Sequence, residues 1–147
     1  MKQLFNLKVD EYTTPSPISV SEEVPYDRVR SLMTEFNIRH IPVVNDEDKP
    51  IGIISERDVL NVSHLPHNER ITASGLMTTK PFCVKSDDSL GDVSFRMSQG
   101  KIGSAVVVEG DGTLFGIFTS TDALNALVEI LRGDYEGDES WNEASLG

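Results

Sequence analysis

The amino-acid sequence predicts a mixed α/β (α+β) fold built from two copies of a β-α-β-β-α unit. Shifting the chain by 64 residues places Pro81 over Pro17 and gives 13 identities within positions 12–61, where unrelated sequence would give roughly three. Each copy also carries apolar residues at helical spacing, followed by short apolar runs that turn residues separate. We therefore expect one structural unit, duplicated.

The composition indicates a folded, acidic protein. A chain of 147 residues can form one compact core or two half-sized units that share one. Its 38% apolar and 25% charged residues are typical of globular proteins. The formal net charge is −11, and residues 133–147 carry five acidic side chains and no basic one. An acidic body repels phosphate backbones, which argues against nucleic acid and anionic membrane surfaces as partners.

Each copy begins with a short strand and a helix. The strands are expected at 17–20 and 81–84, just after a Thr/Pro breaker. Pro25 suits a helix start, and Ser89 with Asp92 three places on predicts an N-cap with an acidic form of the capping box. Apolar residues then recur at three- and four-residue steps: Tyr26, Val29, Met33 and Phe36, and in the second copy Leu90, Val93 and Met97.

Two short apolar strands come next in each copy, at 40–44 and 50–55 and at 104–108 and 114–119. The segments between them contain the Asn, Asp and Gly residues that hairpin turns require. Because these strands are continuously apolar rather than alternating, we expect both faces of each sheet to be covered.

A second helix closes each copy, beginning at Asp58 or Asp122. The later one runs to a stop at Arg132-Gly133, and its wide apolar stripe requires a covering surface, either the first copy or another subunit. The predicted division is a first repeat with its lead-in at 1–61, a linker at 62–75, a second repeat at 76–132 and an acidic tail at 133–147.

One pattern recurs where the last strand of each copy meets its last helix, at 52–58 and 116–122: Gly, two apolar residues, Ser or Thr, two variable residues, Asp. Glycine admits a close backbone approach, a hydroxyl can donate to an anion, and a carboxylate can accept hydrogen bonds from a vicinal diol. Helix N-terminal amides favour phosphate. A capping box explains the same residues, and the two interpretations are compatible.

These motifs resemble a tandem pair of CBS domains, or Bateman module, together with the run Arg39-His40-Ile41-Pro42-Val43-Val44 and the openings 14–20 and 78–84. The resemblance covers residues 12–124. It implies two copies packed pseudo-symmetrically through their sheets, leaving two clefts for adenosyl ligands such as AMP, ADP, ATP, NAD or S-adenosylmethionine. We expect AMP or ATP as a regulatory ligand, and a homodimer, because family members generally dimerise.

The resemblance also implies individual roles. Asp58 and Asp122 would bind ribose hydroxyls, and Ser55 and Thr119 would bind ribose or phosphate. Apolar side chains would enclose adenine and nearby backbone groups would read its edge: Ile18 and Ile41 for one cleft and Phe82 and Ala105 for the other, with Thr14, Ser16, Thr78 and Lys80 supplying the backbone groups. A plain core role explains each apolar residue equally well.

The two copies differ where phosphate would bind. The first has Arg39, His40 and Arg57, whereas the second has Gly103, Ser104 and Thr121. Arginine can hold phosphate through two hydrogen bonds, so we expect stronger anion binding where these cations converge, with Lys101 reaching across from the other copy. The sequence does not fix which cleft that is. For His40, a structural hydrogen bond near Pro42 is an equal alternative.

Other kinds of site find little support. No nucleophile has a neighbouring base in a recognisable pattern, and no Walker-type loop is present, so we expect no catalysis. His64 and His67 lack further ligands at metal spacing and are expected in a solvated turn. Cys83 is expected to be a small buried apolar residue. The single cysteine and the lack of a signal-like or bilayer-length apolar run predict a cytoplasmic protein.

Three functional hypotheses follow. The first is a non-catalytic regulator that binds an adenosyl nucleotide and signals by conformational change to an unidentified protein partner. The second is a structural homodimerisation module without nucleotide, and the third, a remote one, is an enzyme acting on a bound nucleotide. The acidic tail with Trp141 is a candidate partner contact, although a solvated end explains its composition better.

Overall fold

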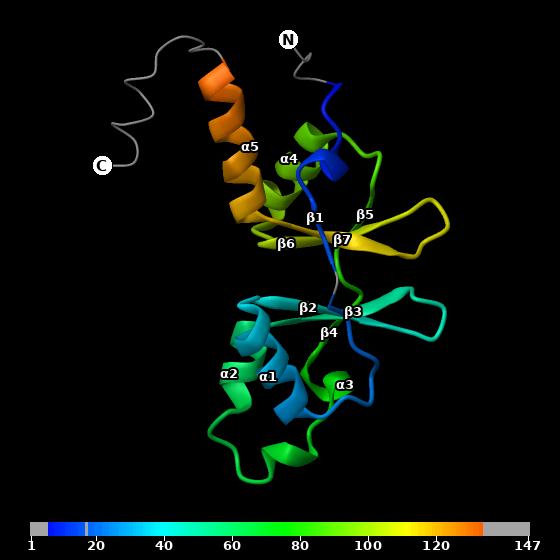
Figure 1. The fold of residues 1–147 in the computed structure, drawn as a ribbon, viewed down its shortest axis with the longest axis vertical. Helices are drawn as coiled ribbons and strands as arrows, with labels where there is room; N and C mark the ends of the chain where they lie inside the picture. The colour runs from blue at the N-terminus through cyan, green and yellow to red at the C-terminus, as the bar shows by residue number, and fades with distance from the viewer. Residues whose placement is uncertain (1–5, 17, 134–147) are drawn as a thin grey trace, which may run out of the picture.

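Two sheets face each other in the middle of the molecule and helices cover their outer sides (Figure 1). The computed structural model describes residues 6–16 and 18–133, so the tail with Trp141 lies outside the described residues. The predicted α+β fold is confirmed, with helices and short strands alternating in both copies. Across the described residues, no helix is long and apolar enough to span a membrane.

The eight main elements follow the repeat. The first copy has α1 (Tyr26–Phe36), β2 (His40–Val44), β3 (Pro50–Ser55) and α2 (Glu56–Val62). The second has α4 (Leu90–Gly100), β6 (Ser104–Val108), β7 (Leu114–Thr119) and α5 (Ser120–Gly133). These four strands begin and end at the predicted residues. The middle three residues of β2 and of β6 are buried, which confirms that both faces of the sheets are covered.

The last helix of each copy begins two residues earlier than predicted. The expected starts, Asp58 and Asp122, are wrong. The extended backbone ends at Ser55 and at Thr119, and helical backbone begins at the next residue. Ser55 is the N-cap of α2, and its side chain accepts a hydrogen bond from the backbone N–H of Asp58. Asp58 is therefore the third residue of the helix, the position that a capping box requires.

The segment that precedes each copy, called its lead-in (residues 6–16 for the first copy and 70–80 for the second), pairs with the sheet of the other copy. β1 (Thr14–Pro15) pairs antiparallel with β7, with Thr14 opposite Ile117. β4 (Thr78–Thr79) pairs in the same way with β3, with Thr78 opposite Ile53. The strand orders are β1-β7-β6-β5 and β2-β3-β4. The two pairings are equivalent, because adding 64 to Thr14 gives Thr78 and adding 64 to Ile53 gives Ile117. The two copies therefore exchange their lead-ins with pseudo-two-fold symmetry.

The hydrophobic cores show the same exchange. The core of the second copy includes Leu7 and Val9, from the start of the chain and the short helix η2 (Val9–Glu11). The core of the first copy includes Ala73 and Leu76 from α3 (Ala73–Leu76). Most of α3, and η3 (Asn68–Arg70) before it, fall in the segment expected to be a linker. That segment contributes to packing as well as to the connection.

The predicted first strands are shorter than expected. In the second copy β5 (Cys83–Lys85) pairs parallel with β6, with Val84 opposite Val107. In the first copy the equivalent pairing is reduced to a single bridge between Val20 and Val43. Proline has no N–H to donate to a ladder, so pairing begins after Pro81 rather than at it.

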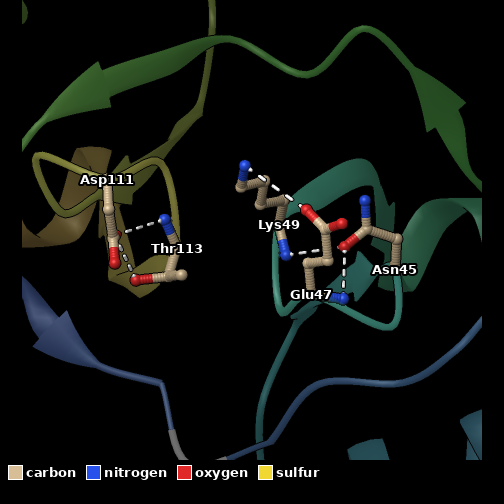
Figure 2. Close-up of polar contacts among 5 residues, drawn as sticks. All are labelled: Asn45, Glu47, Lys49, Asp111 and Thr113. Atoms are coloured by element: carbon tan, nitrogen blue, oxygen red, sulfur yellow. Dashed lines mark hydrogen bonds and ion pairs between the residues drawn. The ribbon is translucent and has the colours of Figure 1, made fainter.

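The predicted hairpin turns are present, and side-chain oxygens stabilise both (Figure 2). Oδ1 of Asn45 accepts hydrogen bonds from the N–H groups of Glu47 at 2.9 Å and Lys49 at 3.0 Å. Oδ1 of Asp111 accepts from the hydroxyl of Thr113 at 2.7 Å and from its N–H at 3.0 Å. These bonds hold the pKa of the Asp111 carboxyl below its ordinary value.

A backbone hydrogen bond joins the hairpins of the two copies. The N–H of Leu114 donates to the carbonyl oxygen of Asp48 at 2.9 Å. The residue equivalent to Leu114 is Pro50, which has no N–H, so the counterpart of this bond cannot form. The pseudo-symmetry is therefore broken at the ends of the hairpins.

Candidate functional site

A cleft of about 540 Å³ opens between the two copies, within the range typical of small-molecule sites. Its walls come from four parts of the chain. These are the N-terminal lead-in, the end of α1 with the start of β2, the residue just before β6, and the junction of β7 with α5. The residues predicted from the sequence that line it are Thr14, Ser16, Ile18, Arg39, His40, Gly103, Thr119, Thr121 and Asp122.

The β7–α5 junction supplies the acidic end of this cleft. The N–H and the hydroxyl of Thr119 both donate to Oδ2 of Asp122, at 2.8 and 3.1 Å. The N–H of Asp122 donates back to the Thr119 hydroxyl at 3.3 Å. The capping interpretation is therefore confirmed. It engages only Oδ2 among the described residues, so Oδ1 of this half-buried carboxylate remains available to accept a hydrogen bond.

Arg39 and His40 supply the basic side of the same cleft. Arg39 is exposed, whereas His40 is partly buried at the start of β2. Burial lowers the pKa of His40 below its ordinary value of 6.5, and Arg39 lowers it further, while Asp58 and Glu56 act in the opposite direction. The imidazole is therefore mainly neutral at pH 7.

The pseudo-equivalent residues of the other copy are arranged in the same way. The N–H of Ser55 donates to Oδ2 of Asp58 at 2.8 Å, and the N–H of Asp58 donates to the Ser55 hydroxyl at 3.2 Å. Thr78, in β4, pairs with Ile53, two residues before Ser55 on β3. Phe82 is the counterpart of Ile18, and the Arg96 guanidinium lies 4.8 Å from its ring centroid.

Several predicted site residues lie outside the 540 Å³ cleft. Ile41, Pro42 and Ala105 are buried in the strands, so their side chains form part of the packed interior. Arg57, Lys80 and Ser104 belong to the pseudo-equivalent arrangement and do not line this cleft. Lys101 is the exposed C-cap of α4, with a left-handed φ of 53°.

The cleft also contains residues that the sequence analysis did not assign to it. Phe36 lines the cleft at the end of α1, although the helical pattern placed it on the buried stripe. It is 47% exposed. Its equivalent in the second copy is Gly100. This difference between the copies is the feature of the sequence that could have pointed to Phe36 as a cleft residue. Pro15, Ile38, Ile117 and Ser120 complete the lining.

The glycines of the recurring motif make room for protein rather than for a ligand. A Cβ at Gly116 would overlap the backbone carbonyl oxygen of Thr14. A Cβ at Gly52 would overlap the side chain of Met77. Both neighbours belong to the exchanged lead-ins, so these glycines allow the lead-ins to pack closely on β7 and β3.

Comparison with known proteins gives consistent results. A homoserine O-acetyltransferase of Methanococcus vannielii is 28% identical over 120 residues, which cover 81% of this chain and 24% of the relative. An uncharacterized protein of Methanopyrus kandleri is 31% identical over 113 residues, which cover 76% of this chain and 55% of the relative. The chain therefore spans about a quarter to just over half of the length of these relatives.

Two solved structures match over most of both chains. AcuB from Vibrio cholerae is 26% identical with a TM-score of 0.78, covering 90% of this chain and 98% of that one. CBSX2 in complex with AMP is 25% identical with a TM-score of 0.73, covering 84% and 97%. The family model of the CBS domain matches residues 9–65 and again residues 73–129. The chain therefore belongs to the CBS domain family and carries two of these domains in tandem.

Proposed function

We propose that this protein is a non-catalytic regulatory module that binds an adenosyl nucleotide, AMP or ATP, in the cleft between its two copies. The observation that carries this proposal is the composition of the cleft. A half-buried carboxylate at the start of α5 shares about 540 Å³ with Arg39 and His40. Few other ligands combine a vicinal diol with an anionic group and a flat apolar ring.

The three parts of such a ligand correspond to three parts of the cleft. Oδ1 of Asp122 can accept hydrogen bonds from the ribose hydroxyls. The amides at the start of α5 and the Arg39 guanidinium favour a phosphate. Ile18, Ile38 and Ile117 supply apolar surface for the base. The complex of the related CBSX2 with AMP supports this assignment.

Isothermal titration calorimetry of the full chain with AMP, ADP, ATP, NAD and S-adenosylmethionine tests the proposal. We expect AMP or ATP to bind, and Asp122→Asn to weaken binding roughly tenfold, the effect of losing a hydrogen bond to a charged acceptor. Ser89→Ala is the matched control, because it removes the N-cap of α4, where Ser89 accepts from the N–H of Asp92, and leaves the cleft intact. Failure of all five ligands to bind would refute the proposal.

The two arrangements of the repeat are proposed to bind unequally. Asp58 is the equivalent of Asp122, so Asp58→Asn is the matching substitution in the first copy. Around Asp58 the repeat places Lys80 and Arg57 where Ser16 and Thr121 lie around Asp122. If the 540 Å³ cleft is the stronger site, Asp122→Asn lowers the affinity of the tightest binding step and Asp58→Asn does not. The reverse result would assign the stronger site to the pseudo-equivalent residues around Asp58.

Signalling is proposed to proceed through a change in the relative placement of the two copies, passed to a separate protein partner in the cytoplasm. Both copies line the cleft, so a bound ligand contacts both and can favour one arrangement over another. The proposal includes no catalysis, and the relative named as an acetyltransferase is matched over only 24% of its length.

A homodimer is proposed as well, because α5 exposes an apolar stripe. Leucine and valine side chains recur on it at three- and four-residue steps with 42% to 60% of their surface exposed: Leu124, Leu127, Val128 and Leu131. Leu60 on α2, the equivalent of Leu124, is 59% exposed. Stripes of this kind are typical of helix–helix interfaces. Dimerisation without any nucleotide binding is the alternative function.

Light scattering after size exclusion tests the dimer. We expect a dimer for the natural sequence and a monomer for Leu127→Glu, which places a charge in the middle of the stripe. Leu65→Glu is the control, because Leu65 is similarly exposed, at 42%, but lies outside α2 and α5. A monomeric natural protein, or a dimer that Leu127→Glu leaves intact, would contradict this assignment.

A further inference from the structure

The start of β2 links the cleft to the first residues of α2. His40 lines the cleft. Within the sheet it lies opposite Ser55, the N-cap of α2. The carbonyl oxygen of the preceding residue, Arg39, accepts a hydrogen bond from the N–H of Glu56 at 2.8 Å. His40 is therefore held between a ligand-sized space on one side and the acidic start of α2 on the other.

Charged groups of both signs surround the imidazole. Asp58 and Glu56, from α2, stabilise its protonated form, whereas Arg39, from its own strand, opposes protonation. Asp122, from α5, is the acidic side chain that shares the cleft with it. Burial has the largest effect and keeps the pKa of His40 below its ordinary value, so the ring is mainly neutral at pH 7 without a ligand.

We propose that His40 is a proton-linked specificity residue, which takes up a proton from solvent when the anionic group of a ligand binds beside it and Arg39. The cleft would then favour phosphorylated adenosyl ligands over neutral or cationic ones, and more strongly at lower pH. This inference rests on the proposed function and adds to it the ligand's charge class and the effect of pH.

The linkage follows from the placement of these groups. A phosphate in the cleft adds negative charge next to a ring that already has Asp58 and Glu56 nearby. The protonated ring is then stabilised by this opposite charge and by hydrogen bonds, because an imidazolium can donate from both nitrogens. A cationic ligand such as a sulfonium gains nothing from this ring and is repelled by Arg39. The equivalent of His40 is Ser104, which cannot titrate, so binding in the other arrangement should not be linked to a proton in this way.

Calorimetry in two buffers of different ionisation enthalpy measures the proton directly. Titration of the full chain with AMP at pH 7 should show net proton uptake, and His40→Gln should abolish most of it. His40→Gln should also weaken AMP binding roughly tenfold while changing adenosine binding by less than about twofold, because adenosine has no phosphate. His64→Gln, at an exposed position outside the cleft, should behave like the natural sequence.

The phosphate of AMP has a pKa of about 6 and also titrates, so the comparison between His40→Gln and the natural sequence at the same pH isolates the histidine. Equal proton uptake and equal AMP affinity in the two proteins would overturn this inference and leave the proposed function standing. If no adenosyl ligand binds the natural sequence, both fall.

Nuclear magnetic resonance gives a second readout that does not depend on affinity. The chain has three histidines, and the His40→Gln spectrum identifies the signal of His40. Saturating AMP should raise the pKa of that imidazole. An unchanged pKa for His40 in the AMP complex would overturn the inference.

Discussion

The two motif glycines provide a matched pair of substitutions, because the repeat makes them equivalent while their neighbours differ. At Gly116 an added Cβ meets the backbone of β1, including the carbonyl oxygen of Thr14. At Gly52 the three nearest atoms all belong to the side chain of Met77. A backbone oxygen in a paired strand cannot rotate away, whereas an unbranched thioether side chain can. We therefore predict that Gly116→Ala is costly and that Gly52→Ala is not.

The size of the difference follows from two opposing effects. Replacing glycine by alanine inside a strand gains about 0.5–1 kcal/mol of unfolding free energy where space allows. Overpacking a rigid neighbour costs about 1–3 kcal/mol. Gly116→Ala should therefore lower the unfolding free energy by a net of about 1–2 kcal/mol, because β1 must separate from β7. Gly52→Ala should change it by less than about 1 kcal/mol, because Met77 can repack.

Urea unfolding followed by circular dichroism measures both free energies, and unchanged slopes would show that the denatured states are comparable. Thermal unfolding should agree, since a chain of this size loses about 2–4 °C per kcal/mol. Gly116→Ala should also weaken AMP binding, because Thr14 and Ser16 line the cleft. Equal costs for the two variants, or a larger cost for Gly52→Ala, would refute the proposed packing of the lead-ins.

Two further predictions concern single residues. Lys101→Gly should raise the unfolding free energy by about 0.5 kcal/mol, because a lysine at φ 53° is strained, whereas Asn37→Gly at φ 51° should be close to neutral, because asparagine tolerates this region. Thermal melts compare the two, and a destabilised Lys101→Gly would contradict the reasoning. Cys83 is exposed in β5 and not buried as the sequence predicts, but neighbouring protein atoms still desolvate its thiol and raise its pKa above the ordinary 9.0. The small stability linked to this group is present below that pH and is lost as pH rises through the higher folded value. Iodoacetamide should accordingly modify Cys83 more slowly in the folded protein than in urea near pH 9, and equal rates would contradict this.

Sequence patterns predicted the parts of the fold that local interactions determine. The hairpin strands begin and end where expected because Asn45 and Asp111 close their turns through their own neighbours. The N-cap at Ser89 is likewise local, since the hydroxyl accepts from an N–H three residues away. The exchange of lead-ins could not be predicted in the same way. In a repeat, β1 matches the pattern of its own copy's β3 as well as that of β7, so the sequence is consistent with either pairing.

The candidate site shows the same division. Sequence reasoning identified Asp122, Thr119, Arg39 and His40 as residue types suited to a nucleotide, but it left open which cations join which carboxylate. That question depends on the packing of the two sheets, a long-range property. The structure places Arg39 and His40 in the cleft that Asp122 lines, whereas Asp58 of their own copy does not line it. Phe36 was missed because a position at the end of a helical stripe can be exposed although its spacing fits a buried face.

The repeat of the sequence is therefore not the folding unit of the protein. Cutting the chain in the expected linker, before Ala73, would separate Leu7 and Val9 from the core that they complete, and Ala73 and Leu76 from theirs. Each half would lose buried apolar surface and the strand that closes its sheet. The cleft depends on the same exchange, since the lead-in that pairs with β7 lines it together with residues of both copies. A ligand bound there contacts the groups that hold the copies together, so its binding energy acts directly on their relative placement.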